Sequence, residues 1–135
     1  MSRWSRANKA VRAELPKGSR VLDVGAARGF GTSSLAGDYA LHSVDVKPAE
    51  ISKAGKGLSS RAVASATALP FAAQSFDGLL CLDVLEHIPD ASAVVAEISR
   101  VLRPGGLLVL TVPNRGVLRK LDSYNLGVAT SIRVR

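Results

Sequence analysis

Small residues crowd one short stretch of the sequence, VLDVGAARGFG (21–31). Three glycines and two alanines occupy five of the seven positions 25–31. Side chains this small let a ligand or another segment approach the backbone closely. An acidic residue, Asp45, follows Gly25 by 20 residues, and a carboxylate at that distance is typical of a site that holds the sugar of a nucleotide or nucleoside. The turn is therefore predicted to bind a ligand of that class.

The spacing of the glycines separates two kinds of nucleotide ligand. A dinucleotide site needs G-x-G-x-x-G, which lets the backbone contact a pyrophosphate. Neither the register that begins at Gly25 nor the one that begins at Gly29 places glycines at the required positions. Residues 25–29 instead match G-x-(G/A)-x-G, with Ala27 in the central position. This pattern favours a nucleoside-type cofactor without a pyrophosphate.

Strand-like and helix-like segments alternate along the chain, and the candidate residues fall where strands end. The apolar run RVLDV (20–24) predicts a buried strand directly before the small-residue turn. Further strands are expected at 41–46, 61–65, 75–84 and 107–113, and helices at 31–40, 47–56 and 91–102. This alternation predicts an α/β fold with an open, mostly parallel sheet, in which ligands bind beyond the carboxyl ends of the strands.

Two local signals bound the third expected helix. Asp90 or Ser92 can cap its first turn, because a short polar side chain can accept a hydrogen bond from a backbone N–H there. The run Pro104-Gly105-Gly106 is expected to end it, before the last predicted strand begins at residue 107.

Composition bounds the class of protein. The chain has 135 residues, 47% of them hydrophobic and 21% charged, which excludes a disordered chain and predicts one domain over 1–135 with its core at 18–115. No apolar stretch is long enough for a membrane span, and residues 1–17, a basic helix, show no secretory signal. The lone Cys81 gives no disulfide framework. These features predict a cytoplasmic protein.

The net charge of +7 is concentrated at the two ends of the chain. Residues 1–20 carry six Lys and Arg against one Glu, and residues 113–135 carry five against one Asp, whereas the middle is mildly acidic. Basic ends are compatible with binding to nucleic acid or to another anionic partner. Solvated side chains on a terminal helix and on the basic tail 116–135 are the favoured interpretation, because aromatic residues for base stacking are few.

Four motifs resemble, in order and spacing, those of one enzyme family. They are VLDVGAARGFG (21–31), SVDV (43–46), ASATALPFAAQSFDGLLCLDVLEHIPD (64–90) and VLRPGGLLVLTVPN (101–114). The chain resembles the S-adenosylmethionine-dependent methyltransferases with a Rossmann-like fold, and among them the small-molecule, lipid and quinone methyltransferases. The resemblance implies a sheet of strand order 3-2-1-4-5 with helices on both faces, and S-adenosyl-L-methionine as the cofactor.

The resemblance also implies roles for individual residues. The implied cofactor-binding residues are Asp23, Gly25, Ala26, Ala27, Gly29, Asp45, Val46, Ser65, Ala66, Leu82 and Asp83. Asp23 and the loop 25–29 would face the methionine part of the cofactor, and Asp45 would accept hydrogen bonds from the ribose hydroxyls. Val46 would pack on the adenine, whose edge Ser65 and Ala66 would flank. Leu82 and Asp83 would border the methionine amino group and the methyl donor.

Two positions depart from the family's usual pattern. Ala27 stands where a second glycine is usual, and Ser65 stands where an aspartate is usual. Both departures predict weaker cofactor binding, because Ala27 adds a methyl group and Ser65 offers a hydrogen bond without a charge. Arg28 either points to solvent or clamps the cofactor carboxylate, with solvent favoured.

The motif LDVLEHIPD (82–90) holds the candidate catalytic residue, His87. It would act as a general base if the methyl acceptor is a hydroxyl; the alternative is a histidine that only shapes its loop. Asp83, Glu86 and His87 also form D-x-x-E-H, which is similar to the E-x-x-E-H metal site of some O-methyltransferases, although a site without a metal is predicted here. The motif is not the (N/D)PPY signature of enzymes that methylate amino groups of nucleic acid bases. This difference favours oxygen or carbon as the acceptor atom.

Three functions stay open at this point. The leading one is methyl transfer to a small-molecule or lipid-like acceptor, and the others are a non-catalytic or truncated methyltransferase-like subunit and a nucleic-acid-directed methyltransferase. The chain also lacks the room for the family's C-terminal antiparallel hairpin beside the strand 107–113. The tail is therefore expected to cover that edge, or a second chain to pair with it in a homo- or hetero-oligomer, or the chain to be a truncated version.

Overall fold

The computed structural model describes residues 3–25, 32–51, 57–111 and 132–133. Six strands form one sheet in the order β3-β2-β1-β4-β5-β6. The strands are β1 (Arg20–Val24), β2 (Ala40–Asp45), β3 (Ser60–Val63), β4 (Phe76–Leu82), β5 (Leu102–Thr111) and β6 (Ile132–Arg133). The first five strands are parallel to one another, so the predicted α/β fold and strand order 3-2-1-4-5 are confirmed.

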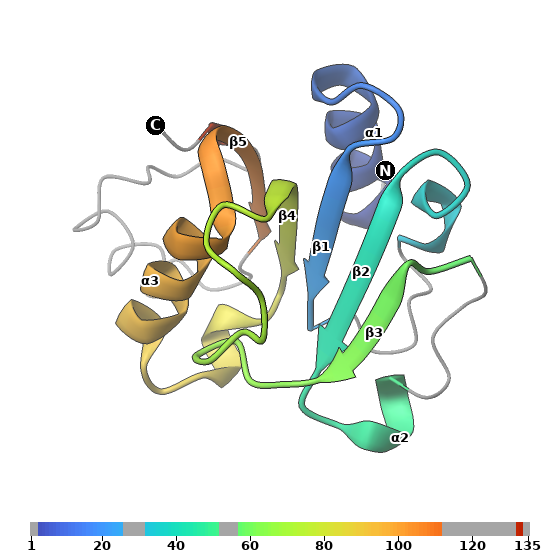
Figure 1. The fold of residues 1–135 in the computed structure, drawn as a ribbon. Helices are drawn as coiled ribbons and strands as arrows, with labels where there is room; N and C mark the ends of the chain where they lie inside the picture. The colour runs from blue at the N-terminus through green and yellow to red at the C-terminus, as the bar shows by residue number, and fades with distance from the viewer. Residues whose placement is uncertain (1–2, 26–31, 52–56, 112–131, 134–135) are drawn as a thin grey trace.

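Helices cover both faces of this sheet (Figure 1). Helix α1 (Arg3–Glu14) packs on one face through Ala7 and Val11, and Leu15, directly after the helix, joins the same cluster. Helix α3 (Ala91–Val101) packs on the other face through its buried residues Val94, Val95, Ile98 and Val101. The two apolar clusters share the strands β1, β4 and β5, whose alternate side chains point to opposite faces.

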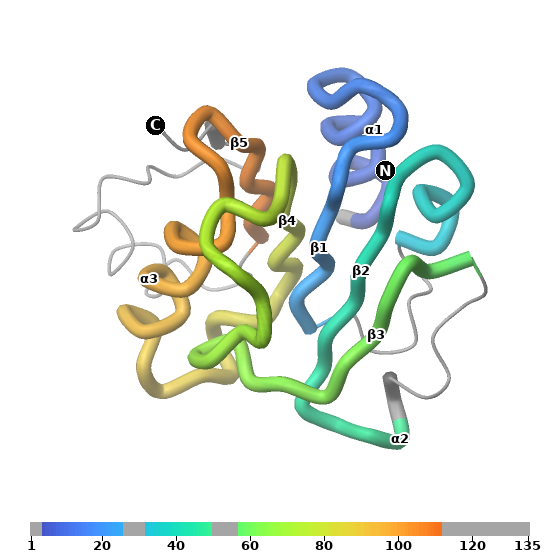
Figure 2. The backbone as a smooth tube through the Cα atoms, in the orientation of Figure 1, coloured from blue at the N-terminus to red at the C-terminus, as the bar shows by residue number. Residues whose placement is uncertain are grey.

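The centre of the sheet joins segments that are far apart in the sequence. Strand β4 lies beside β1, with Leu22 opposite Leu79 and Val24 opposite Cys81 (Figure 2). Cys81 is buried there, and burial raises the pKa of its thiol to about 12. The central strands are apolar on both faces because each face is covered by helices. Because these strands are parallel, their carboxyl ends meet along a single edge of the sheet.

The remaining helices are short. Helix α2 (Pro48–Ile51) contacts β2 and β3, and residues 52–56 of the helix expected at 47–56 lie outside the described residues. The helix expected at 31–40 is a single 3-10 turn, η1 (Ser33–Leu35). The reason for this difference is tertiary: Leu35 is buried beneath α1, and the Tyr39 hydroxyl donates to the α1-side carbonyls of Val11 (3.4 Å) and Leu15 (3.0 Å).

The junction of α3 and β5 differs from the expectation. Asp90 does cap α3, accepting from the Ala93 N–H at 3.1 Å. The helix ends at Val101, however, and β5 begins at once at Leu102, so that residues 104–106 lie inside a strand that was expected to begin at 107. A bulge between Phe76 and Gly78 accommodates the extra residues.

The tail reaches the edge of β5. Strand β6 pairs antiparallel with it, placing Arg133 opposite Leu107 and Ile132 opposite Leu108. This is the first of the three outcomes expected for that edge, and it is seen at the two residues of the tail that the structure describes. Among the helices of the described segments, none has the length and apolarity to cross a bilayer.

Candidate active site

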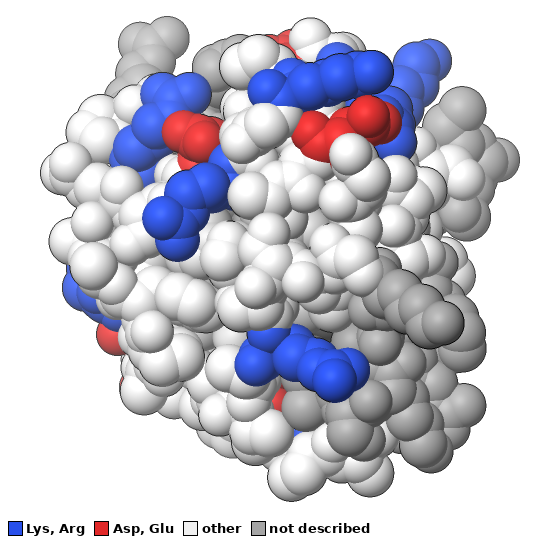
Figure 3. All heavy atoms as spheres, turned by 45° about the vertical axis from the view of Figure 1, so that its right-hand side comes forward, with Lys and Arg blue, Asp and Glu red and all other residues white. Residues whose placement is uncertain are grey.

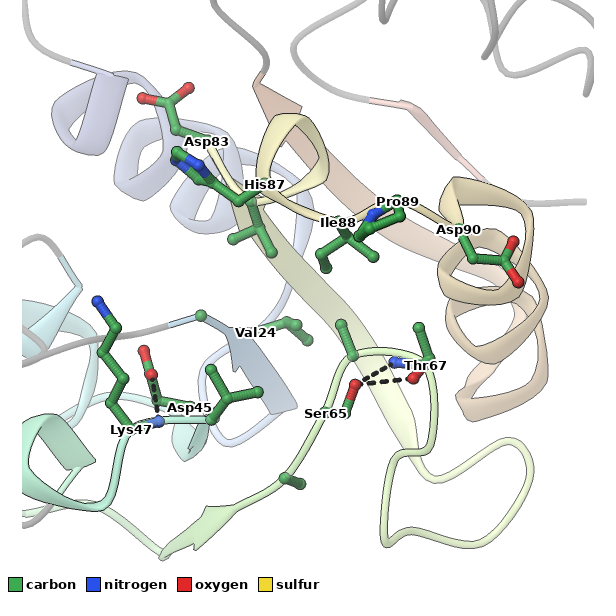
Figure 4. Close-up of a pocket in the computed structure, with 15 residues that line it drawn as sticks. Val24, Asp45, Lys47, Ser65, Thr67, Asp83, His87, Ile88, Pro89 and Asp90 are labelled. Carbon is green, nitrogen blue, oxygen red and sulfur yellow. Dashed lines mark hydrogen bonds between the residues drawn. The ribbon is translucent and has the colours of Figure 1, made fainter.

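A cavity of about 700 Å³ opens at the carboxyl ends of the strands (Figure 4). Its walls come from the ends of β1, β2, β3 and β4 and from the loop that leads into α3. The lining residues are Val24, Gly25, Asp45, Val46, Lys47, Ala64, Ser65, Ala66, Thr67, Asp83, Val84, His87, Ile88, Pro89 and Asp90. Seven of the predicted cofactor-binding and catalytic residues are among them: Gly25, Asp45, Val46, Ser65, Ala66, Asp83 and His87.

Asp45 is the last residue of β2, and its carboxylate is held at the cavity wall. Its Oδ1 accepts the Lys47 N–H at 2.9 Å, and its carbonyl accepts the Ala64 N–H at 3.0 Å. Only 9% of the residue is exposed. A carboxylate carries several acceptor lone pairs, so Asp45 has the chemistry to receive two neighbouring hydroxyl groups as well as the backbone N–H.

Next to Asp45 the cavity wall is apolar. Val46 lines the cavity and is 59% exposed, so its methyl groups are open to a ligand there. Ser65, which also lines the cavity, begins a tight turn in which its Oγ accepts the Thr67 N–H at 3.2 Å and lies 2.7 Å from the Thr67 Oγ1. Exposed methyl groups and a small polar turn in one cavity suit a flat ring with polar edges.

Gly25 brings the backbone of the first turn to the cavity. Its φ is +73°, and its N–H donates to the Val44 carbonyl at 2.9 Å. A Cβ at this position would lie 2.4 Å from the Val84 Cγ2, so only glycine fits both the backbone angle and the space. Residues 26–31 lie outside the described residues, and the roles predicted for Ala26, Ala27 and Gly29 and the alternatives for Arg28 stay predictions.

Asp23 lies behind the cavity wall and does not line it. Only 4% of it is exposed, and its Oδ2 accepts a 2.5 Å hydrogen bond from the Thr32 hydroxyl. Burial in an apolar strand raises the pKa of Asp23 to about 7, with a smaller contribution from the charge of Asp45 and an opposing one from the Thr32 bond. Asp23 and Thr32 thereby join the two ends of the small-residue turn. Direct contact of Asp23 with a ligand stays a prediction.

The end of β4 turns sharply at Asp83. This residue has a φ of +55°, which side chains other than glycine adopt rarely, at a cost of about 1–3 kcal/mol. Asp83 lines the cavity, whereas Leu82, the preceding residue and also a predicted binding residue, packs beneath α1 and does not line it. Strained residues of this kind cluster at functional sites.

His87 lies at the mouth of the cavity, at the end of the 3-10 turn η2 (Leu85–His87). Its side chain is 77% exposed, and its Nε2 is 3.5 Å from the Glu86 Oε1. An exposed imidazole beside a cavity can exchange protons with both ligand and water. Within the described part of the chain, no group of three or more His, Cys, Asp or Glu side chains has the arrangement of a metal site, and Asp83, Glu86 and His87 do not form one.

Some lining residues were not predicted from the sequence. They are Val24, Lys47, Ala64, Thr67, Val84 and the run Ile88-Pro89-Asp90. Each lies within two residues of a predicted position or continues its motif, so widening the motifs by two residues would have found most of them. Thr32 and Thr111, which hold the predicted acids Asp23 and Asp83, had no such signal because they come from other parts of the sequence.

Known proteins match the part of the chain that forms the sheet and the cavity. A family model described as a methyltransferase domain matches residues 22–110. The chain belongs to this methyltransferase family. It is 30% identical over 125 residues to a ubiquinone biosynthesis O-methyltransferase from Idiomarina loihiensis, a match that covers 87% of this chain and 50% of that protein.

Solved structures of other proteins superpose well on the chain. The YcgJ protein from Bacillus subtilis matches with a TM-score of 0.73 and 24% identity, over 98% of this chain and 61% of that one. The [4+2]-cyclase SpnF matches with a TM-score of 0.68 and 29% identity, over 76% of this chain and 42% of that one. The chain spans about half the length of the curated relatives it matches. The comparisons thus show the family and the fold of this part of the relatives.

Proposed function

We propose that this chain binds S-adenosyl-L-methionine and transfers its methyl group to an oxygen or carbon of a small-molecule or lipid-like acceptor. The observation that carries the proposal is the Asp45 carboxylate, fixed at the end of β2 beside the exposed Val46 on the wall of the cavity. An adenosyl group presents a ribose diol and a flat adenine ring. A carboxylate suits the diol, at about 1.5–3 kcal/mol for each charged hydrogen bond, and the valine suits the ring face.

The chain's residues fit the proposed cofactor at three points. Asp45 would bind the ribose, Ser65 and Ala66 would border the adenine, and the backbone of Gly25 would pass close to the ligand. The cofactor, when bound, supplies a methyl group on a sulfonium sulfur. An acceptor atom can attack this methyl group in line with the sulfur, which is the leaving group. The protein's main contribution is to hold the acceptor in line with that methyl group, which can lower the barrier by about 7–11 kcal/mol.

His87 is the proposed general base when the acceptor is a hydroxyl. In that case the imidazole Nε2 or Nδ1 of His87 would take the proton that the acceptor hydroxyl loses on methylation. The exposed position of His87 at the cavity mouth then allows the proton to leave to water. A base of this kind contributes about 10²–10⁴-fold in rate. An acceptor carbon that is already nucleophilic would not need it.

The class of acceptor is supported by the relatives. Curated relatives bear names such as ubiquinone biosynthesis O-methyltransferase, and another is the O-methyltransferase cnsE of Penicillium expansum, which is 34% identical over 110 residues. These names favour a hydroxyl on a small ring compound. The proposed reaction belongs in the cytoplasm, where a single buried cysteine needs no disulfide partner.

Nucleic acid is less well supported as the acceptor. Two of the basic side chains near the N-terminus are neutralised within the protein: Asp38 accepts Arg12 at 2.6 Å and lies 3.5 Å from Lys17. On the face drawn in Figure 3, Lys and Arg form separate groups with uncharged surface between them and acidic groups beside some of them. A nucleic-acid site is expected to be a continuous basic stripe instead.

Two measurements test the proposed function. Calorimetric titration with S-adenosylhomocysteine is expected to give a single site per chain; absence of heat at tens of micromolar protein would favour a non-catalytic subunit. Incubation with S-adenosylmethionine and a set of catechols, hydroquinones and fatty acids, followed by mass spectrometry, is expected to show one acceptor that gains the mass of one methylene. Because the chain spans half its relatives, an assay that detects binding without transfer would assign this domain to cofactor binding alone.

A further inference from the structure

Arg100 lies in the last turn of α3, outside the cavity, and its guanidinium reaches the loop that precedes β4. Its Nη1 donates to the Phe71 carbonyl at 2.7 Å, and its Nη2 donates to the Leu69 carbonyl at 3.0 Å. The backbone joins the same two segments, because the Arg100 carbonyl accepts the Gln74 N–H at 2.8 Å. Gln74 has a φ of +56°, a conformation that persists only where its surroundings hold it. The loop 69–74 is thus attached to the end of α3 at three places.

Glu97, one helical turn earlier, holds the guanidinium in this position. Its Oε2 accepts hydrogen bonds from the Arg100 Nε at 2.8 Å and from the Nη2 at 2.6 Å. A guanidinium carries its donors in a fixed planar fork, so it can bond to one carboxylate and two carbonyls together. A lysine ammonium carries its charge on a single nitrogen and lacks this spacing of donors. The arrangement therefore requires an arginine.

The turn that lines the cavity lies directly before the loop that the guanidinium holds. Ser65 begins this turn, and its carbonyl accepts the Ala68 N–H at 3.0 Å. The next residue along the chain carries the first of the two carbonyls that bond to the guanidinium. On the other side of the turn, the Ala64 N–H donates to the Asp45 carbonyl at 3.0 Å. The turn is therefore fixed at one end to β2 and at the other end to α3.

Helix α3 also carries a second wall of this part of the cavity. Asp90, which lines the cavity, caps the first turn of α3. Figure 4 shows Ser65 and Thr67 on one segment of the wall and the run 88–90, which leads into α3, on another. Both segments are consequently attached to the same helix, one through the chain at its first turn and one through Arg100 at its last. The placement of the turn relative to the run 88–90 depends on that arginine.

Apolar packing also holds the loop 69–74 on the sheet. Leu69 is buried, and Phe71 packs against the same apolar cluster. Such packing has no preferred direction, whereas hydrogen bonds to two carbonyls fix the orientation of the backbone. Without the guanidinium, the loop is expected to stay packed while the turn before it is less precisely placed.

We propose that Arg100, held by Glu97, is a positioning residue for the base of the adenosyl ligand, because it fixes the turn 65–68 where the edge of the base is distinguished. This inference rests on the proposed function, since it takes the ligand of the cavity to be an adenosyl compound whose base lies at this turn. It goes beyond that function in assigning part of the base selectivity to an ion pair outside the cavity.

Two ligands that differ only at the edge of the base test the proposal. S-adenosylhomocysteine carries an amino group on its purine, whereas S-inosylhomocysteine carries a carbonyl oxygen there and a proton on the neighbouring ring nitrogen. The ribose and the amino-acid part are identical, so the ratio of the two dissociation constants measures selectivity for the base. Both constants are measured by calorimetry on the wild type, Arg100→Lys, Glu97→Gln and Arg103→Lys.

Arg103→Lys is the matched control. Arg103 follows three residues later, and its side chain is 42% exposed against 38% for Arg100. Its Nε donates to the Asp77 Oδ1 at 2.7 Å and its Nη1 to the Pro104 carbonyl at 3.3 Å, so its bonds go to other segments than the loop 69–74. The control therefore also loses a bonded guanidinium from this region, without releasing the turn.

The wild type is expected to bind S-adenosylhomocysteine at least about 10-fold more tightly than S-inosylhomocysteine, because polar groups placed for one base edge are left unpaired by the other. Arg100→Lys is expected to weaken S-adenosylhomocysteine by about 5-fold and S-inosylhomocysteine by less than about 2-fold. Glu97→Gln is expected to lower the selectivity in the same direction by a smaller factor. Arg103→Lys is expected to keep the wild-type ratio.

Both ligands are titrated into the same sample, so a partly unfolded fraction lowers the number of sites for both and leaves the ratio unchanged. If Arg100→Lys does not fold, Glu97→Gln decides, and an unchanged ratio in that variant would overturn the proposal. Equal weakening of both ligands by Arg100→Lys, or the same loss of selectivity in Arg103→Lys, would make Arg100 a general structural residue and would also overturn it.

The wild type separates this inference from the proposed function. A wild-type protein that binds both ligands equally well would overturn the inference, while the proposed function stands. Failure of the wild type to bind either ligand would instead overturn the proposed function, and this inference with it.

Discussion

The same residue types occur at both ends of the sheet but meet different surroundings. Asp38 precedes β2 and is paired with Arg12 and Lys17, whereas Asp45, at the other end of that strand, faces the cavity. Gly18 precedes β1 with a φ of +88° and open space around it, whereas Gly25 follows β1 with a φ of +73° and Val84 directly against it.

The two histidines follow the same division. His42 lies toward the amino ends of the strands, where its ring meets Phe71 and Phe76 edge to face at 6.3 and 5.3 Å and its Nδ1 lies 2.6 Å from the Ser60 Oγ. His87 is exposed at the mouth of the cavity. At the amino ends the protein itself supplies partners for its polar groups. At the carboxyl ends, Gly25, Asp45 and Asp83 line a cavity, which is the arrangement expected of a binding site.

The largest effect is expected from Asp23, the buried acid behind the cavity. In the folded protein its pKa is about 7, against 3.8 for the ordinary side chain, so the folded state holds a proton that the unfolded chain releases. Stability therefore falls as pH rises from about 4 to 7, by on the order of 4 kcal/mol. Asp23→Asn is expected to lack this loss, so that its unfolding free energy in urea gains on the wild type between pH 4.5 and pH 8.

Asp38→Asn is the matched control at the other end of the sheet. The Arg12 guanidinium and then Lys17 hold the pKa of Asp38 below its usual range. The stability that Asp38 contributes is thus present above its unfolded pKa and lost as pH falls, the opposite sign to Asp23. Curves for the wild type and Asp23→Asn that stay parallel from pH 4.5 to pH 8 would contradict the assignment of a proton to the folded form.

The two positive-φ glycines provide the second contrast. Gly18→Ala introduces backbone strain alone, and a cost of about 1 kcal/mol is expected. Gly25→Ala adds a Cβ that would lie 2.4 Å from the Val84 Cγ2, and the combined strain and overpacking are expected to cost about 3 kcal/mol. Urea unfolding measures both costs. Binding of S-adenosylhomocysteine is expected to weaken in Gly25→Ala alone, and equal unfolding costs would remove the contrast.

The histidines are expected to give the smallest change in stability. His42→Gln loses two ring contacts and the Ser60 bond, at about 1–2 kcal/mol, whereas His87→Gln is expected to stay within about 0.5 kcal/mol of the wild type. Burial, with a smaller contribution from Arg20, lowers the pKa of His42, so the folded state disfavours its protonation and the wild type loses stability as pH falls below about 6.5. That loss should be absent in His42→Gln. Thermal unfolding at pH 5.5 and pH 8 measures this loss of stability. An equal change with pH in the wild type and in His42→Gln would contradict the prediction.

The strands were predictable because their apolar runs are local signals. RVLDV and SFDGLLCLDV are long enough and apolar enough to indicate buried parallel strands whatever surrounds them. The junction of α3 and β5 was not predictable, because its geometry depends on a distant residue. Arg103 donates to the Asp77 Oδ1 at 2.7 Å, and Gly106 packs against the Arg103 and Asp77 carbonyls. With these contacts and the bulge between Phe76 and Gly78, residues 102–106 form part of the strand β5.

The candidate site divides in the same way. Asp45 and Ser65 could be placed at one edge of the sheet because each follows a recognisable strand. The residues that hold the acids come from elsewhere in the sequence. Thr32 reaches Asp23 across nine positions and Thr111 reaches Asp83 across 28, and no local pattern specifies either pair. The strained φ of Asp83 could likewise be seen only in three dimensions.

Asp45 provides the most direct test of the contrast between the two ends of β2. Titration calorimetry with S-adenosylhomocysteine on Asp45→Ala and Asp38→Ala compares the acid facing the cavity with the acid paired at the surface. Asp45→Ala is expected to weaken binding by about 100-fold or more, because two charge-assisted hydrogen bonds are lost, while Asp38→Ala keeps the wild-type constant. An unchanged dissociation constant in Asp45→Ala would contradict the assignment of this cavity to an adenosyl ligand.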